Sequence, residues 1–537
     1  MKHVAMFLIA SCLATIAGSV ALADKAGGSE PIHIGSRLEP LIDDDLIDQR
    51  AGALELELHS PVRHSDAIVL DRPWEGNNSG YATILKHDDT FLFYYRGSGL
   101  VLTEGHVGGK GFATTCVMTS KDGIQWTRPN LGFVQREGWE NNNIILTYDT
   151  SGKVDESNLD AGNDLLSGKK VKFTGGVHNF TPVIDTNPDC KSDEVFKALG
   201  GHDHRLLYAY KSPDGIHWSL MQETPVIFDG MLDSQNLAIW DPVQKCYCAY
   251  YRAFKNRKGD TRQLDQKKDY SDMDRDVKFA VSQDFLNWSR GQWIDWQPDR
   301  MTQLYTSQIQ LYPGADHLRI GFPMRYVINR GQYSEFNERI AKSDRYYSSV
   351  YTDTGLITSR DGRSFKVWPE AMLRPGPTNE NWFYSFGETA LNLFETPSRF
   401  PGGPNEWSFY VLDHGAWFGA GATFNRYSIR KDGFVSASSP MAGGSFVTKP
   451  IVFSGNALRI NFETSANGSV RFELQDLDGT PLPGLSLDDC PALLGNSVAY
   501  TVHWNSDARL ADYAGRPVRL KVELKDADLF AIRFVEK

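Results

Sequence analysis

The sequence predicts an all-β protein in which a five-bladed β-propeller is followed by a C-terminal β-sandwich. Two observations lead to this prediction. A short turn motif recurs over most of the chain, and after about residue 445 it gives way to long stretches that alternate apolar and polar residues. The 537 residues also include 48 glycines and 12% aromatic residues, a mixture typical of turn-rich β proteins. We expect the propeller over residues 60–444 and the sandwich over residues 445–537.

The recurring motif is a serine, an aspartate two residues later that is usually followed by glycine, and then an aromatic residue. Its copies begin at Ser120, Ser212, Ser282 and Ser359, with a weaker fifth copy at residues 430–434. An Asp-Gly pair between apolar runs indicates a tight turn between two strands. Two further strands precede each copy, the first starting with polar residues and the second rich in aromatics. Four strands repeated five times is the pattern of a propeller with five blades.

The N-terminus has the pattern of a secretory signal peptide. Lys2 and His3 precede an apolar run over residues 4–17, and small residues at positions 21 and 23 fit the cleavage rule. We therefore expect a signal peptide over residues 1–23, cleavage after Ala23, and a secreted or periplasmic mature protein. No later stretch approaches 18 consecutive apolar residues, so no membrane span is expected after the leader is removed.

Residues 24–59 form an N-terminal segment ahead of the first blade. Leu54, Leu56 and Leu58 alternate with polar residues there, as in an edge strand. We expect this segment to complete or cover a blade.

Charge and cysteine content narrow the possible partners. The chain has 56 basic and 67 acidic residues without a basic tract, so nucleic acid is not an expected partner. Five cysteines remain beyond the leader, and their spacing fits neither a disulfide framework nor a zinc site. We expect them to be apolar core residues and expect no metal or other cofactor, while a structural Ca²⁺ ion stays open. The five are Cys116, Cys190, Cys246, Cys248 and Cys490.

Propeller geometry gathers polar residues at one end of the central channel. The start of the first strand and the end of the second strand of every blade lie on the same face, and the first strands line the axis. The first-strand starts supply Asp233 and Glu388 together with His178, Asn179, Gln235 and Asn236. The second-strand ends supply Arg96, Arg252, Arg325 and His414. We expect this mouth to be the functional site. Of the residues just named, all except Asp233 and Glu388 are expected to bind substrate.

Two carboxyl groups at one opening are what glycosidic cleavage needs, one protonated to assist the leaving group and one ionised. Asp233 and Glu388 are the expected catalytic acids, and Glu75 and Asp45 are the next candidates. The remaining conspicuous aspartates fall in turns on the opposite face, where we expect them to accept backbone hydrogen bonds. They are Asp122, Asp214, Asp241, Asp284 and Asp361.

The repeats, the five blades and the trailing sandwich resemble glycoside hydrolase family 32, with family 43 as its single-domain relative. A closer similarity, over nearly the whole mature chain, is to secreted bacterial proteins described as family-32-like. It rests on residues 41–47, 72–75, 178–180, 233–236 and 525–529. Family 32 implies three acids in fixed motifs, but this chain has no Asn-Asp-Pro-Asn, no Arg-Asp-Pro at a strand start and no Glu-Cys. The resemblance therefore implies the fold and a glycosidase site, without fructose chemistry.

The leading hypothesis is a secreted enzyme that cleaves glycosidic bonds in a poly- or oligosaccharide. A non-catalytic carbohydrate-binding propeller is one alternative, and a structural surface protein without a ligand is another. A third is a sialidase-like enzyme in which Arg96, Arg252 and Arg325 clamp a carboxylate through two-point hydrogen bonds, although sialidases have six blades. The same three arginines suggest an anionic glycan as the substrate. The alternative is that each arginine pairs within its own blade or binds the hydroxyls of a neutral sugar.

Overall fold

The computed structural model describes residues 30–149, 178–201, 205–256, 273–298, 302–384, 386–414, 417 and 421–537. The expected signal peptide, residues 1–23, lies outside these ranges. Strands predominate in the described residues, where the α-helical part is the short α2 (Glu335–Ala341). The predicted all-β class is confirmed. No helix in these ranges is both long and apolar enough to cross a membrane.

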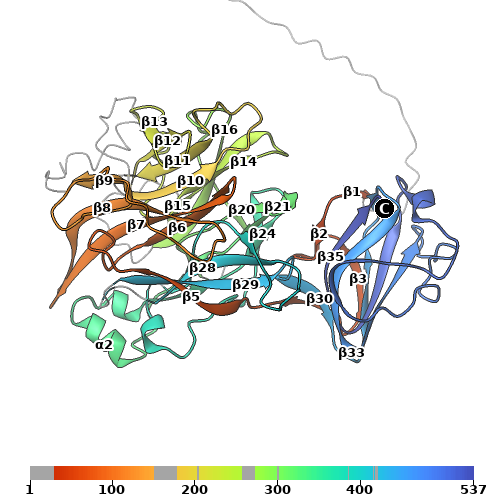
Figure 1. The fold of residues 1–537 in the computed structure, drawn as a ribbon. Helices are drawn as coiled ribbons and strands as arrows, with labels where there is room; N and C mark the ends of the chain where they lie inside the picture. The colour runs from red at the N-terminus through yellow and green to blue at the C-terminus, as the bar shows by residue number, and fades with distance from the viewer. Residues whose placement is uncertain are drawn as a thin grey trace, which may run out of the picture.

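Three regular antiparallel sheets come first, each built from consecutive strands (Figure 1). The first sheet contains β6 (Gly80–His87), β7 (Thr90–Thr103), β8 (His106–Ser120) and β9 (Ile144–Asp149). The second contains β10 (His178–Ile184), β11 (Phe196–Gly201), β12 (Leu207–Ser212) and β13 (Ser219–Leu220). The third contains β14 (Leu237–Asp241), β15 (Cys246–Asn256), β16 (Met273–Ser282) and β17 (Gln292–Trp293).

The fourth sheet is less regular. Its antiparallel strands are β20 (Gln310–Tyr312), β21 (Ala315–Gly321), β24 (Ile357–Ser359) and β25 (Ser364–Val367), and β18 (Asp295–Gln297) joins β25 in parallel. A separate small sheet contains β19 (Gln303–Leu304), β22 (Met324–Val327) and β23 (Tyr351–Thr354).

The fifth sheet joins the two ends of the repeat region. β26 (Glu388–Thr389) and β27 (Phe394–Thr396) both pair with β28 (Glu406–His414), which pairs with β29 (Ala422–Arg430). The outermost strand is β5 (Val62–Leu70), which precedes the first sheet in the chain. An early strand therefore completes the last sheet of the repeat region.

The first strands of these sheets meet at a common centre. β6 contacts β10 and β26, β10 contacts β14, and β14 contacts β20. Buried amides connect them further: the Gln235 Nε2 donates to the carbonyl of Ala82 at 3.0 Å. The Gln308 Nε2 donates to the Oε1 of Gln235 at 2.7 Å and to the carbonyl of Thr389. The starts of the first strands are thereby held close together.

The repeated aspartates form turns, as the sequence predicts. In the first copy, Asp122 Oδ1 accepts the backbone N–H groups of Ile124 and Gln125, both at 2.8 Å. The Ser120 Oγ accepts the N–H of Gly123 at 2.9 Å. The same aspartate bonds recur at the other copies, at Asp214, Asp284 and Asp361. Asp241 also caps a turn, accepting two backbone N–H groups at 2.9 Å.

A second β region contains the first and the last described strands, β1 and β35 (Figure 1). Its strands from the C-terminal part are β30 (Val435–Ser439), β31 (Gly444–Thr448), β33 (Ala457–Gln475), β34 (Asn496–Thr501) and β35 (Arg519–Val535). The N-terminal segment adds β2 (Glu39–Pro40), β3 (Ile47–Gly52) and the edge strand β4 (Glu55–Leu58), while β1 (Ile32–Gly35) pairs with β32 (Ile451–Phe453). Hence most of this segment belongs to the C-terminal sheet rather than to a blade, and the sheet begins before residue 445.

The five described cysteines are unpaired, as expected. Four of them are buried, and Cys190 is half-buried. The apolar-core interpretation therefore holds for all but Cys190.

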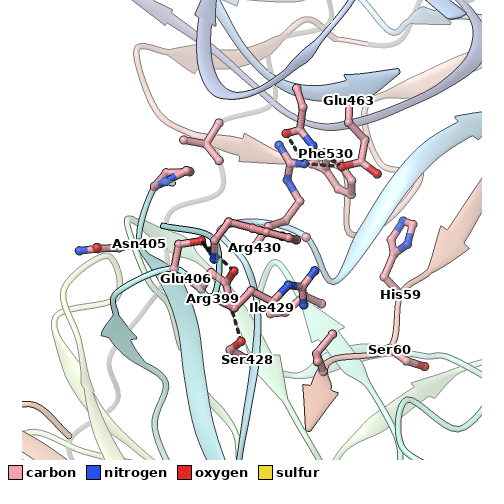
Figure 2. Close-up of a pocket in the computed structure, with 17 residues that line it drawn as sticks. His59, Ser60, Arg399, Asn405, Glu406, Ser428, Ile429, Arg430, Glu463 and Phe530 are labelled. Atoms are coloured by element: carbon pink, nitrogen blue, oxygen red, sulfur yellow. Dashed lines mark hydrogen bonds and ion pairs between the residues drawn. The ribbon is translucent and has the colours of Figure 1, made fainter. Parts of the chain in front are cut away.

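A cavity of about 240 Å³ lies between the fifth sheet and the C-terminal sheet. Figure 2 shows Arg430 of β29 extending across it toward Glu463 of β33 and Phe530 of β35. Its guanidinium donates to the Oε2 of Glu463 at 2.6 Å and to the Oδ1 of Asn461 at 2.7 Å, and lies 4.4 Å from the centre of the Phe530 ring. Because Arg430 binds side chains of the C-terminal sheet, we interpret this cavity as a structural interface.

We predict that Arg430→Met lowers the free energy of unfolding by about 2 kcal/mol, because charged hydrogen bonds are lost and the buried Asn461 loses a donor. Arg399→Met is the matched control: Arg399 lines the same cavity but is exposed, so its loss should cost less than about 0.5 kcal/mol. Denaturant unfolding followed by fluorescence measures both values. Equal stability of the two variants would show that Arg430 does not hold the interface together.

Candidate active site

Glu388 lies at the start of β26, and its position depends on two glycines. Gly387 has a φ of +82°, and a Cβ there would approach the Thr354 Oγ1 to 2.8 Å, so glycine lets β26 pack against β23. A Cβ on Gly80 would lie 3.0 Å from the Glu388 Oε1. The backbone N–H of Tyr81 donates to this same carboxyl oxygen. The carboxyl group therefore sits on the backbone at the start of β6.

Burial changes the acidity of Glu388. The residue is 5% exposed, and desolvation raises the pKa of its carboxyl group from 4.5 to about 7, although the Tyr81 N–H and the charge of Arg96 lower it. At neutral pH a large fraction of this group is protonated. A buried carboxylic acid that keeps its proton near neutral pH is suited to general-acid catalysis.

Asp233 precedes β14 and has a different environment. Its side chain is 32% exposed, and its Oδ2 lies 4.0 Å from an Nη2 of Arg252. Arg252 itself is 5% exposed and is held by its Nε, which donates to the carbonyl of Met231 at 2.8 Å. The opposite charge of the guanidinium stabilises the ionised carboxylate of Asp233.

Tyr81 connects the two acids. The charges of both Asp233 and Glu388 raise the pKa of the Tyr81 hydroxyl, after the larger effect of burial. This hydroxyl is 2.7 Å from the hydroxyl of Tyr305, which also accepts a hydrogen bond from Tyr384 at 2.7 Å. The fold therefore brings the two predicted acids to one buried tyrosine.

These tyrosines belong to a larger aromatic cluster that extends to β22. Tyr305 stacks on Tyr326 with ring centres 5.6 Å apart and on Tyr81 at 6.4 Å. Tyr347 packs against Tyr384 at 5.1 Å, and the charge of Asp233 contributes to a raised pKa of Tyr347. Tyr81, Tyr305 and Tyr326 are buried, whereas Tyr347 and Tyr384 are partly exposed, so these two rings are available for contact with the apolar faces of sugars. We call Tyr81, Tyr305, Tyr326, Tyr347 and Tyr384 the tyrosine cluster.

Three arginines lie over this cluster. The guanidinium carbon of Arg96 is 4.5 Å from the centre of the Tyr81 ring, and that of Arg252 is 5.2 Å from Tyr305. Arg275 is 4.0 Å from the centre of Tyr326 and 5.6 Å from Tyr305. The sequence analysis did not single out Arg275. It pairs with Phe254 across β15 and β16, so counting back from the Ser282 motif would have placed it at the mouth.

The predicted amides lie close to these groups, but two of them are committed to the fold. Asn179 has a φ of +53° and is 1% exposed, and its Oδ1 accepts a hydrogen bond from Arg96 at 3.0 Å. Gln235 belongs to the central amide network described above. The Asn236 Oδ1 accepts the backbone N–H of Arg252 at 2.9 Å, which positions that arginine.

The two histidines can be placed only through their backbones. His178 opens β10 opposite Gly201, and His414 closes β28 opposite Thr423. Both therefore lie at the strand ends where the sequence places them. Their side chains lie outside the described part of the structure, and their assignment as substrate-binding residues stays a prediction.

Glu75 is buried away from solvent as part of the first sheet's internal packing. It is 0% exposed, and Arg128 donates to both of its carboxyl oxygens, at 2.8 and 3.1 Å. Tyr95 donates to the same carboxylate at 2.6 Å. Because these donors occupy the carboxylate, the structure assigns Glu75 a structural role in place of the expected catalytic one.

Asp45 and Arg325 likewise have partners elsewhere. The Asp45 carboxylate lies 3.3 Å from Arg360, whose guanidinium is also bound by Asp43, and 4.0 Å from Lys449 of the C-terminal sheet. Arg325 makes a two-point pair with Asp353 at 2.6 and 2.7 Å. Because these partners bind Asp45 and Arg325, we do not include either residue in the site proposed below.

The chemistry available is that of paired carboxyl groups. In the described residues, no group of three or more His, Cys, Asp or Glu side chains is placed to hold a metal ion. A protonated Glu388 and an ionised Asp233, flanked by arginines and tyrosine hydroxyls, can assist departure of an alkoxide and stabilise positive charge.

The contact between Gly80 and Glu388 yields a selective test. In Gly80→Ala the new methyl group meets the end of a flexible side chain, so the carboxyl group should shift while the fold remains. We expect an unfolding midpoint within a few degrees of the wild type and a fall of about tenfold or more in kcat, because small misplacements of a catalytic group are costly. Paired melting and rate measurements check this. Full activity in Gly80→Ala would contradict the assigned position of the acid.

Comparisons with known proteins show distant structural similarity. No family model and no curated protein matches the chain. A family 43 arabinoxylan arabinofuranohydrolase from Bacillus subtilis matches with a TM-score of 0.39 and 9% identity, over 87% of this chain and 99% of that one. A glycosyl hydrolase from Bacteroides ovatus matches at 0.36 and 12%, over 74% and 94% of the two chains. An N-acetylgalactosamine deacetylase from F. plautii matches at 0.35 and 10%, over 75% and 95%.

Proposed function

We propose that this protein is a glycoside hydrolase that cleaves a poly- or oligosaccharide with Glu388 as general acid and Asp233 as the ionised partner. The observation that carries the proposal is the contrast between the two carboxyl groups. The buried Glu388 has a pKa of about 7, whereas the partly exposed Asp233 faces a guanidinium. Unequal environments of two nearby carboxyl groups are what acid and base roles require.

In this mechanism Glu388 donates its proton to the glycosidic oxygen as the bond breaks. Asp233 either attacks the sugar carbon directly or removes a proton from the attacking water, and the two routes differ in the stereochemistry of the product. The Tyr81 N–H holds the Glu388 carboxyl group in place. When Glu388 has lost its proton, the nearby Arg96 stabilises the carboxylate until it is protonated again.

The proposal includes an architecture. The five larger sheets between residues 62 and 430 would be the blades of a propeller, with the N-terminal β5 completing the last blade. The C-terminal sheet and its buried core would form the sandwich. The leader pattern of residues 1–23 supports action outside the cytoplasm.

A panel of plant, algal and animal polysaccharides, assayed for new reducing ends, tests the proposal. Wild-type protein and Asp45→Asn should both release sugar from at least one polysaccharide, because Asp45 pairs with Arg360 rather than with the tyrosine cluster. Glu388→Gln should release none above background. Binding of a polysaccharide without any turnover would instead establish the carbohydrate-binding alternative.

A further inference from the structure

Positive charge exceeds negative charge at the tyrosine cluster. Arg96, Arg252 and Arg275 all lie within 5.6 Å of one of its ring centres. The acids whose charges act on the Tyr81 hydroxyl are Asp233, which faces Arg252, and Glu388. Asp344 accepts the backbone N–H of Tyr347 at 3.0 Å. Because the pKa of Glu388 is raised to about 7, this acid is often neutral and then balances no arginine.

Three unsatisfied hydrogen-bond donors also lie around the cluster. The Nε of Arg96, the Nε of Arg275 and the Nδ2 of Asn179 are buried without a hydrogen-bond partner in the described part of the chain. All three are donors, and Asn179 is 1% exposed. Buried N–H donors without partners cost free energy, and so do several positive charges placed close together. A ligand that carries negative charge and several acceptor oxygens would relieve both costs.

Two of the three arginines have side chains that solvent can reach. Arg96 and Arg275 are half-buried. The Nη1 of Arg275 donates to the Oε1 of Gln303 at 3.0 Å, its side chain also hydrogen-bonds to Tyr346, and its Nε is left without a partner. A planar guanidinium binds carboxylate and sulfate groups in a two-point fashion.

We propose that the site binds an acidic glycan, with a sugar carboxylate or sulfate held by Arg96 and Arg275 while the partly exposed Tyr347 and Tyr384 contact the sugar rings. Arg275 thus takes the place that the sequence analysis gave to Arg325. This inference rests on the proposed hydrolase function only for its location, since binding can be measured without turnover.

Affinity electrophoresis of the Glu388→Gln protein tests the inference. Gels contain polygalacturonate or alginate as uronate probes, chondroitin sulfate or carrageenan as sulfate probes, and galactan or arabinoxylan as neutral probes. The chain has a formal net charge of −11, so an acidic polymer repels it as a whole, and retardation reports a local site. We expect at least one acidic glycan to retard the protein more than any neutral one, and the uronate and sulfate gels separate the two chemistries.

Arginine variants in the same background identify the residues responsible. Arg275→Met and Arg96→Met should each weaken binding about tenfold or more, as loss of a charged hydrogen bond predicts. Arg363→Met is the control, because this arginine also lies over an aromatic ring, 5.3 Å from Phe279, but in the turn after β24. Arg275→Lys keeps the charge and should retain part of the affinity, which covers the case in which a methionine variant is unstable.

Two results would overturn the inference: acidic glycans that retard the protein no more than neutral ones, or unchanged binding in folded Arg275→Met and Arg96→Met. Turnover and binding separate the two proposals. Wild-type protein that binds an acidic glycan without cleaving it refutes the hydrolase and leaves this inference standing. Hydrolysis restricted to neutral glycans would support the hydrolase and refute the acidic-glycan inference.

Discussion

Replacing Glu388 with glutamine is expected to lower kcat by a factor on the order of a thousand. The amide matches the carboxyl group in shape but has no proton to give to the leaving oxygen, and general-acid catalysis contributes about 10²–10⁴-fold. The Oε1 still accepts the N–H of Tyr81, so substrate affinity should change little. Initial rates on the best substrate of the polysaccharide panel measure both parameters.

The stability of this variant separates a catalytic from a structural role. The pKa of Glu388 is higher in the folded protein, about 7, than its ordinary 4.5. The folded state therefore binds this proton more tightly, and the stabilising effect, complete below about pH 4.5, is lost as the pH rises to about 7. Glu388→Gln should lack this contribution and be no less stable than wild type at pH 8. A variant that is inactive because it is unfolded would contradict the assignment.

The second large effect is expected for Asp233→Asn, which should also lower kcat by a factor on the order of a thousand. The amide cannot act as a nucleophile or base, and it leaves Arg252 without the carboxylate 4.0 Å away. Because the side chain is 32% exposed, the fold should tolerate the change.

Chemical rescue supplies the control for Asp233. Azide or formate is a small nucleophile that fits the space left by the carboxylate, so it should restore product formation in Asp233→Gly if Asp233 is the nucleophile or base. The same salts should have no effect on Glu75→Gln, because Glu75 is enclosed by Arg128 and Tyr95. Full activity in Asp233→Asn would remove this residue from the mechanism.

The all-β class and the repeated turns could be predicted because they depend on local patterns. The Ser-x-Asp-Gly motif encodes its own hydrogen bonds, as at Asp122. Propeller geometry places the starts of the first strands on one face, which predicts that Glu388 and Asp233 lie together. In the structure the charges of both residues act on Tyr81. Tyr81 and Tyr305 were within reach of the same rule, since each lies within one or two residues of a predicted strand start.

The remaining differences concern long-range partners, which a local pattern does not specify. The sequence around Asp45 does not predict that its partner is Arg360, which lies in a turn of the fourth sheet. Glu75 precedes the first sheet as expected. Its carboxylate, however, is bound by Arg128, which follows the third strand of that sheet. Arg325 sits at a predicted strand end, yet the neighbouring strand β23 brings Asp353 opposite it. In each case a nearby opposite charge decided the role.

Titration of the Glu388 carboxyl group tests the central claim most directly. Protein labelled with ¹³C at the glutamate side-chain carboxyl can be followed by NMR from pH 4 to pH 9, with Glu388→Gln to assign the signal. We expect one carboxyl resonance with a midpoint near pH 7, and this resonance should be missing from the variant. If the resonance lost in Glu388→Gln titrates at or below the ordinary pKa of 4.5, Glu388 is ionised at neutral pH and cannot be the acid.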